Sequence, residues 1–127
     1  MPNHCHNTLT LQGSPEFIQT IVNTQFSFKT LIPLEDYSND SCIESWGTKW
    51  DCWDFNVIKK SNNMIIFECT TAWSPPIKIL YMLVDKCDAW IKCQWHEEGG
   101  LAGIIVGDNK EVKELIWEDM CIEEMAS

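Results

Sequence analysis

The sequence predicts an α+β fold in which two helices pack on one face of an antiparallel sheet. Its 127 residues suit one domain, and 45% hydrophobic with 22% charged residues is an ordinary globular composition. Several short stretches alternate apolar and polar residues, as half-buried strands do, and two stretches repeat apolar residues at helical spacing. These observations exclude disordered and low-complexity chains.

The first predicted strand covers residues 6–11, where leucines alternate with β-branched threonines. A helix follows from Ser14 to about Asn23, because Ser-Pro-Glu supplies a cap, a proline and an acid at its start. Residues 26–32 then predict a second strand, which ends at Pro33.

A long polar connection is predicted over residues 33–51, which carry acidic residues and turn formers. Connections of this length in compact domains are usually functional or disordered. This one ends in Trp-Gly-Thr-Lys-Trp-Asp, and such aromatic content argues against disorder. The segment is therefore predicted to be functional.

The middle of the chain predicts a hairpin with strands over residues 53–57 and 64–72. A second helix follows, with Ser74 as its cap and Pro75 at its first position, and it runs to about Lys86. Apolar residues lie almost all round this helix, so we expect it to be packed deeply.

Three more strands are predicted over residues 89–97, 101–106 and 112–117, with turns between them. The acidic tail 118–127 is expected to be frayed. The order of elements predicts a ferredoxin-like sandwich with added C-terminal strands, built as a single domain over residues 1–127.

The charge balance limits the classes of partner. Nineteen acidic residues and nine basic ones, all lysine, give a net charge of −10. Nucleic-acid and anionic membrane surfaces attract basic proteins, so neither is a predicted partner. The longest apolar stretch, residues 79–84, is too short to span a bilayer.

Seven cysteines occur without any Cys-x-x-Cys pair, and the start of the chain lacks an apolar signal segment. We therefore expect free thiols, packed as small hydrophobes, in a reducing cytoplasm. His4, Cys5 and His6 stand close together, but a structural zinc site needs a second ligand pair, and His96 is alone. No metal or cofactor is predicted.

Four sequence segments carry a resemblance to a known family: residues 1–9, 46–51, 71–76 and 97–103. In this order they make the chain similar to the Api92-like family of phage and plasmid proteins, which has a ferredoxin-like domain. The resemblance covers most of the chain. It implies a mobile-element origin, hence a host-cell cytoplasm, and a ferredoxin-like fold, but no particular activity.

The candidate ligand-binding residues begin with Trp46, Lys49, Trp50 and Asp51. Indole faces stack on nucleobases, the lysine can contact a phosphate, and the carboxylate can accept a hydrogen bond from a ribose hydroxyl. The alternative is a loop held to the body of the protein by its own tryptophans.

Trp73, Ser74 and Glu97 complete the candidate set. Trp73 could stack on a base beside the helix N-terminus, where backbone N–H groups attract anions, and the other two could form hydrogen bonds. The alternative for Ser74 is a helix cap alone. No nucleophile, acid–base pair, phosphate loop or dinucleotide fingerprint is recognisable, so no catalytic residue is predicted.

Two functions follow from these observations. The first is a non-enzymatic phage protein that sequesters a small nucleotide-like immune signal, an anti-defence sponge, with a homo-oligomer sharing the ligand. The second is an acidic inhibitor that binds a host protein in place of DNA, and the net charge of −10 favours this function. A small nucleotide hydrolase is a third class and would need one essential Glu or His.

Overall fold

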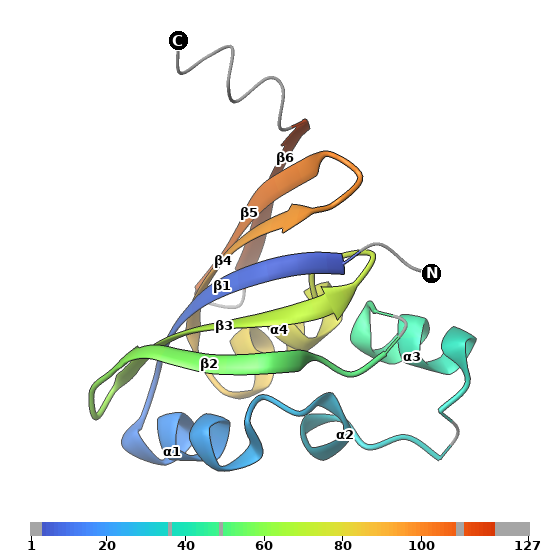
Figure 1. Cartoon of the computed structure of the whole chain (residues 1–127). Coiled ribbons are helices and arrows are strands. Elements are labelled where there is room, and N and C mark those ends of the chain that lie inside the picture. Colours follow the sequence, from blue (N-terminus) through green and yellow to red (C-terminus); the bar gives the residue numbers. More distant parts are fainter. Residues whose placement is uncertain (1–3, 36, 49, 109–110, 119–127) are drawn as a thin grey trace, which may run out of the picture.

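Six strands form one antiparallel sheet in the order β2-β3-β1-β4-β5-β6 (Figure 1). The computed structural model describes residues 4–35, 37–48, 50–108 and 111–118. The strands are β1 (His4–Gln12), β2 (Trp53–Lys60), β3 (Met64–Ala72), β4 (Trp90–Glu97), β5 (Leu101–Asp108) and β6 (Glu111–Glu118). Residues 119–127, the greater part of the expected frayed tail, lie outside the described residues.

Helices cover one face of this sheet and leave the other open. They are α1 (Pro15–Thr24), α2 (Phe28–Leu31), α3 (Asn39–Trp46) and α4 (Ile77–Lys86). Each contributes buried side chains to a core shared with the inward residues of the strands. In Figure 1, α4 lies behind the sheet, and β1 and β3 face the viewer. None of the helices in the described part of the chain has the length and apolar character needed to cross a membrane.

The strand order confirms the predicted ferredoxin-like arrangement. Strand β3 lies between β1 and β2, and β4 pairs with the other edge of β1, as in the split βαβ unit. Strands β5 and β6 then extend the sheet beyond β4, as expected for added C-terminal strands. Each neighbouring pair is antiparallel.

Two predictions for the connection before β2 were wrong. Residues 26–32 form no strand: Gln25 and Phe26 have positive φ angles, and the short helix α2 follows. The alternation of phenylalanines there arises because Phe26 and Phe28 both enter the core, with ring centroids 5.4 Å apart. The long connection also contains helix α3, whose cap Ser38 accepts a hydrogen bond from the backbone of Ser41.

The predicted cap of the second long helix was also wrong. Pro76 occupies the cap position of α4 and makes no side-chain bond there. The hydroxyl of Ser74 instead donates to the carbonyl of Gly47, 2.9 Å away, and so ties the turn before α4 to the end of α3. The helix is less deeply packed than expected, since Tyr81 is exposed while four other side chains are buried.

A buried amide organises the core face of the three central strands. The Asn7 amide donates to the carbonyls of Cys5 and Cys69, at 3.1 and 3.3 Å, and to the Thr71 hydroxyl at 3.0 Å. Its oxygen accepts from the thiols of Cys5 and Cys93, both at 3.8 Å. A polar side chain in the core is thus fully engaged, as burial requires.

The thiols around this amide are held in their protonated form. Burial raises the pKa of Cys5 to about 12, with a nearby hydroxyl opposing and a carboxylate adding to the shift. Burial also raises the pKa of Cys93, and the hydrogen bond with Cys52 raises that of Cys69. All six cysteines in the described part of the chain are free. Thiols of this kind are structural and are poor nucleophiles.

The buried thiols predict a loss of stability at alkaline pH. A thiol whose pKa is higher in the folded state contributes stability that is complete below its unfolded pKa, about 8.5, and is lost as pH rises above it. The free energy of unfolding should therefore fall above that pH by about 1.4 kcal/mol per pH unit for each such thiol. Urea unfolding between about pH 8 and 11 measures this slope.

Two variants separate titration from packing. In Cys93→Ala the free energy of unfolding should fall less steeply with pH, because one titrating thiol is missing. Its stability at neutral pH should also be lower. Leu9→Ala removes apolar volume at the position paired with Cys93 and should keep the wild-type slope. Parallel slopes in wild type and Cys93→Ala would show that this thiol does not carry the effect.

Candidate ligand-binding site

A cavity of about 300 Å³ lies beside α2 and α3. We call it the tryptophan cavity; its lining residues are Lys29, Tyr37, Cys42, Trp46, Trp50 and Asp51. Three of the residues predicted from the sequence therefore meet at one place. The other three come from the segment interpreted as a strand and a loop, so sequence reasoning missed them.

Trp46 forms the floor of the tryptophan cavity. Its side chain is only 1% exposed, and its indole N–H donates to the carbonyl of Ile32 at 2.9 Å. The rings of Phe28 and Tyr37 pack against it, with centroids 5.8 and 5.9 Å away. This tryptophan anchors the connection to the core, which matches the alternative raised for it, and its faces are not open for stacking.

Asp51 holds the start of α2. Its carboxylate accepts hydrogen bonds from the Ser27 hydroxyl at 3.0 Å and from the backbone N–H groups of Phe28 at 2.8 Å and Lys29 at 3.2 Å. A fourth bond comes from the backbone of Cys52 at 2.8 Å. An acidic side chain therefore caps a short helix from a distant part of the chain. Its oxygens already have partners within the protein.

Trp50 brings an exposed ring to this cavity, and Lys29 brings a positive charge. Trp50 is 43% exposed, and its ring centroid lies 6.4 Å from that of Trp53. The Lys29 ammonium lies 5.2 Å above the ring of Tyr37, a cation–π contact that positions the charge. Lys49, the predicted phosphate contact, lies outside the described residues.

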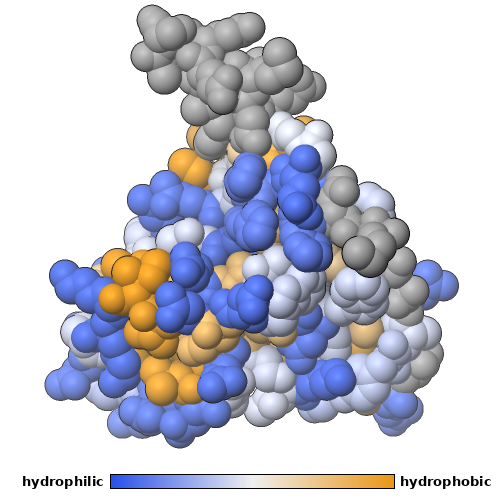
Figure 2. Space-filling view, in the orientation of Figure 1, coloured by the Kyte–Doolittle hydropathy of each residue, from blue (hydrophilic) through white to orange (hydrophobic). Residues whose placement is uncertain are grey.

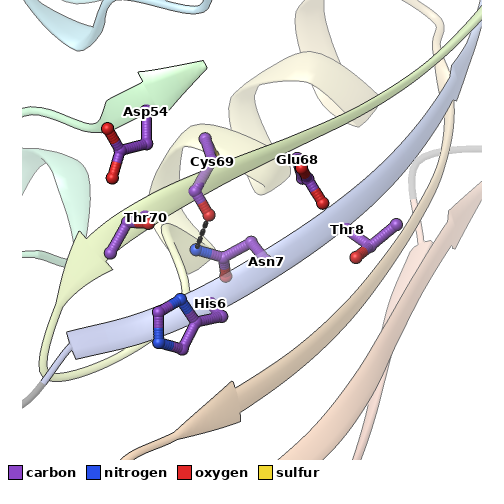
Figure 3. Close-up of a pocket in the computed structure, with 7 residues that line it drawn as sticks. All are labelled: His6, Asn7, Thr8, Asp54, Glu68, Cys69 and Thr70. Carbon is purple, nitrogen blue, oxygen red and sulfur yellow. Dashed lines mark hydrogen bonds between the residues drawn. The ribbon is translucent and has the colours of Figure 1, made fainter. Parts of the chain in front are cut away.

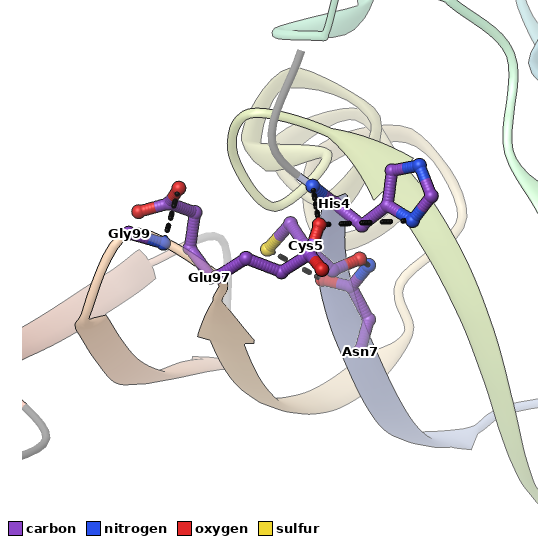
Figure 4. A network of polar contacts seen from close by, with 6 residues as sticks. His4, Cys5, Asn7, Glu97 and Gly99 are labelled. Carbon is purple, nitrogen blue, oxygen red and sulfur yellow. Dashed lines mark hydrogen bonds and ion pairs between the residues drawn. The ribbon is translucent and has the colours of Figure 1, made fainter. Parts of the chain in front are cut away.

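The remaining predicted residues do not line the tryptophan cavity. Trp73 is 51% exposed in the turn after β3 and has a left-handed φ of 71°. Glu97 is 7% exposed at the end of β4, where its carboxylate accepts from the backbone N–H of Gly99 at 2.8 Å (Figure 4). It closes the β4–β5 turn. Glu98, beside it, contacts His4 through the imidazole Nδ1 at 3.7 Å.

A second cavity of about 280 Å³ lies over β1 and β3 on the open face of the sheet (Figure 3). We call it the open-face cavity; its lining residues are His6, Asn7, Thr8, Asp54, Glu68, Cys69 and Thr70. Antiparallel register brings them together, because His6 is opposite Thr70 and Thr8 is opposite Glu68. No short motif in the sequence marks this grouping. Within the described ranges, no three His, Cys, Asp or Glu side chains are grouped closely enough to hold a metal ion.

The capping by Asp51 predicts a strong effect on stability at this site. Asp51→Ala removes four accepted hydrogen bonds and should lower the free energy of unfolding by about 2–4 kcal/mol. Trp50→Ala removes an exposed ring and should cost less than about 1 kcal/mol. Urea unfolding followed by circular dichroism compares the two variants.

Asp40→Ala is the matched control, since Asp40 is an exposed acid in the first turn of α3. Its loss should cost at most about 1 kcal/mol. An Asp51→Ala variant as stable as Asp40→Ala would show that the four bonds do not hold α2 in place.

Comparison with known proteins supports the fold. A family model described as the ferredoxin-like domain in Api92-like protein matches residues 39–126. The crystal structure of a protein api92 from Yersinia pseudotuberculosis is similar with a TM-score of 0.52 and 17% sequence identity, over 61% of this chain and 30% of that chain. This chain therefore spans less than a third of that structure's length. No curated protein matches.

Proposed function

The chain belongs to the Api92-like family through its ferredoxin-like domain, and we propose that it is a non-enzymatic binding protein for a small nucleotide-like ligand. The observation that carries the proposal is the tryptophan cavity, where an exposed indole and a positioned ammonium line the same space. An aromatic face can stack on a base, and the ammonium can contact a phosphate.

Trp50 and Lys29 would contact different parts of the ligand. Trp50 takes the role of stacking surface, because its ring is exposed whereas that of Trp46 is buried. Lys29 takes the role first assigned to Lys49, since its ammonium is held over Tyr37 within the cavity lining. Asp51 contributes indirectly by fixing the backbone of Lys29.

Binding without turnover is the better fit to these groups. The Asp51 carboxylate is engaged in four hydrogen bonds, so it is a poor general base. A protein of this kind would act by lowering the free concentration of its ligand, which is the role of an anti-defence sponge made by a phage. Tyr37 and Trp50 are both exposed at the cavity, and a second copy of the chain could cover them and enclose the ligand.

The net charge supports a second candidate function. At −10 the chain could instead present its carboxylates to a basic host protein in place of DNA. Association through surface charge weakens steeply with ionic strength. Binding of a base stacked in a cavity depends much less on added salt. The salt dependence of the two activities therefore separates them.

Substitutions in the tryptophan cavity test the first function. Stacking contributes about 1–3 kcal/mol per base, so Trp50→Ala should weaken nucleotide binding by about 5- to 150-fold. Lys29→Ala should weaken binding of phosphorylated ligands more than that of nucleosides. Isothermal titration calorimetry with mononucleotides, cyclic dinucleotides and nucleosides measures both effects.

Tyr81→Ala is the control, because it removes an exposed aromatic ring from α4, outside the cavity lining. It should bind as wild type does. Wild-type affinity in folded Trp50→Ala, or no binding of any nucleotide by the wild type, would contradict the proposal.

A further inference from the structure

We propose that the outer edge of β6 binds an extended segment of a partner protein in which apolar and basic residues alternate, and that this segment adds to the sheet as a further strand. Strand β6 is the last strand of the sheet, and within the described ranges only β5 pairs with it. The edge of such a strand presents N–H and C=O groups that another chain can pair with. The surface shares no residue with the tryptophan cavity, so this inference does not rest on the function proposed above.

The two edges of the sheet differ in how they are protected. The pairing of β2 with β3 shifts register twice, and β2 ends in Lys59 and Lys60. Bulges and lysines of this kind hinder pairing with another chain. Strand β6 pairs with β5 continuously, from Glu111 opposite Asp108 to Glu118 opposite Leu101, with no shift of register. The β6 edge is therefore regular enough to accept a further strand.

An apolar groove of about 580 Å³ lies beside β6; its lining residues are Ile104, Val106, Lys113, Glu114 and Leu115. Leu115 lies opposite Ile104 in the pairing of β6 with β5, and it is 68% exposed. These two side chains belong to the open face, because Gly107, on the other face, lies against Val84 of α4. Hydrophobic surface near the top of Figure 2, below the grey atoms, lies at the level of β5 and β6 in Figure 1. Apolar side chains of an added strand would cover this groove.

The helix side of β6 is acidic. Glu114 lies opposite the buried Ile105, which places its side chain on this side, and it is exposed. A cavity of about 300 Å³ separates α4 from β6; its lining residues are Tyr81, Met82, Val84, Asp85 and Val112. Asp85 is also exposed, and no lysine lines this cavity. Basic side chains of an added strand would complement the two carboxylates.

The two sides of β6 together define the pattern of the partner segment. Side chains of a strand point alternately to the two faces of a sheet. One set of side chains in an added strand would therefore lie over the apolar groove, and the other set would lie beside Glu114 and Asp85. Alternating apolar and basic residues fit both sides at once.

A second copy of β6 fits this edge less well. Antiparallel pairing of two copies would bring a second Glu114 to the side that already holds Glu114 and Asp85. Each copy also has a net charge of −10. Like charges on neighbouring strands are destabilising, so charge complementarity favours a basic segment over a second copy.

Synthetic peptides test the pattern on the full chain. The probe is a blocked peptide of alternating valine and lysine, about eight residues long, which is an ordinary strand length. Its control has the same composition with the valines and the lysines in two blocks. Calorimetry should show binding of the alternating peptide, and binding of the block peptide that is weaker by about tenfold or more. Equal affinity for the two peptides would show that charge alone attracts them.

Methylation of the peptide backbone tests strand addition itself. In an extended strand the N–H groups of alternate residues point to opposite edges. Methylating the valine nitrogens and methylating the lysine nitrogens therefore block opposite edges of the peptide. One of these two peptides should lose binding and the other should keep it. Loss of binding by both, or by neither, contradicts pairing along β6.

Leu115→Ala and Glu114→Gln test the two sides of the strand. Leu115→Ala should weaken peptide binding by about three- to tenfold, because it removes exposed apolar surface from the groove. Glu114→Gln should weaken binding by about two- to fivefold at low salt, and the difference should vanish near 1 M salt, where the Debye length is about 3 Å. Leu115→Ala should bind nucleotides as wild type does, so the two proposals can fail separately.

Ile58→Ala and Glu44→Gln are the matched controls. Ile58 is 54% exposed on β2, at the opposite edge of the sheet, and Glu44 is exposed on α3. Both variants should bind the alternating peptide as wild type does. The proposal is overturned if the alternating peptide does not bind, or if Ile58→Ala weakens binding as much as Leu115→Ala does. It is also overturned if sedimentation shows a dimer of the full chain that Leu115→Ala dissociates, since a second copy would then occupy the edge.

Discussion

The carboxylate of Asp51 is the interaction on which the helical side of the site depends. It accepts bonds from the Ser27 hydroxyl and from the backbone of Phe28, Lys29 and Cys52. The start of α2 is thereby fixed to the segment that precedes β2. A four-residue helix has little stability of its own, since helix nucleation costs more than one turn recovers. Without this anchor, neither Lys29 nor the wall of the tryptophan cavity would have a defined place.

The alternation along β1 organises both faces of the sheet. Cys5, Asn7, Leu9 and Leu11 point into the core, while the residues between them are partly or fully exposed. The inward set holds the thiols and the amide that stabilise the three central strands. The outward set includes His6, which lies opposite Thr70 of β3 and His96 of β4. A single strand thus supplies the centre of the core and one wall of the open-face cavity.

Strands such as β1 and β4 could be predicted because apolar and polar residues alternate along them, whereas β5 was recognisable as a short apolar run. The helices α2 and α3 could not, since Phe26 and Phe28 mimic that alternation and α3 is short and polar. The cluster of Trp46, Trp50 and Asp51 was visible as an aromatic segment. The separate roles of these three residues could not be predicted. The burial of Trp46 and the capping of α2 by Asp51 both depend on tertiary contacts between distant parts of the chain. No sequence pattern indicates that Asp54 and Thr70 line one cavity, because a β-bulge and the register of β2 with β3 bring them together.

The two cavities differ in their charged groups: one ammonium and one carboxylate line the tryptophan cavity, and two carboxylates line the open-face cavity. Lys29 makes the tryptophan cavity locally favourable to an anion, although the net charge of −10 repels that anion at long range. Added salt screens the long-range repulsion more than the contact with a nearby ammonium. The proposed binding of an anion in the tryptophan cavity should therefore tolerate added salt.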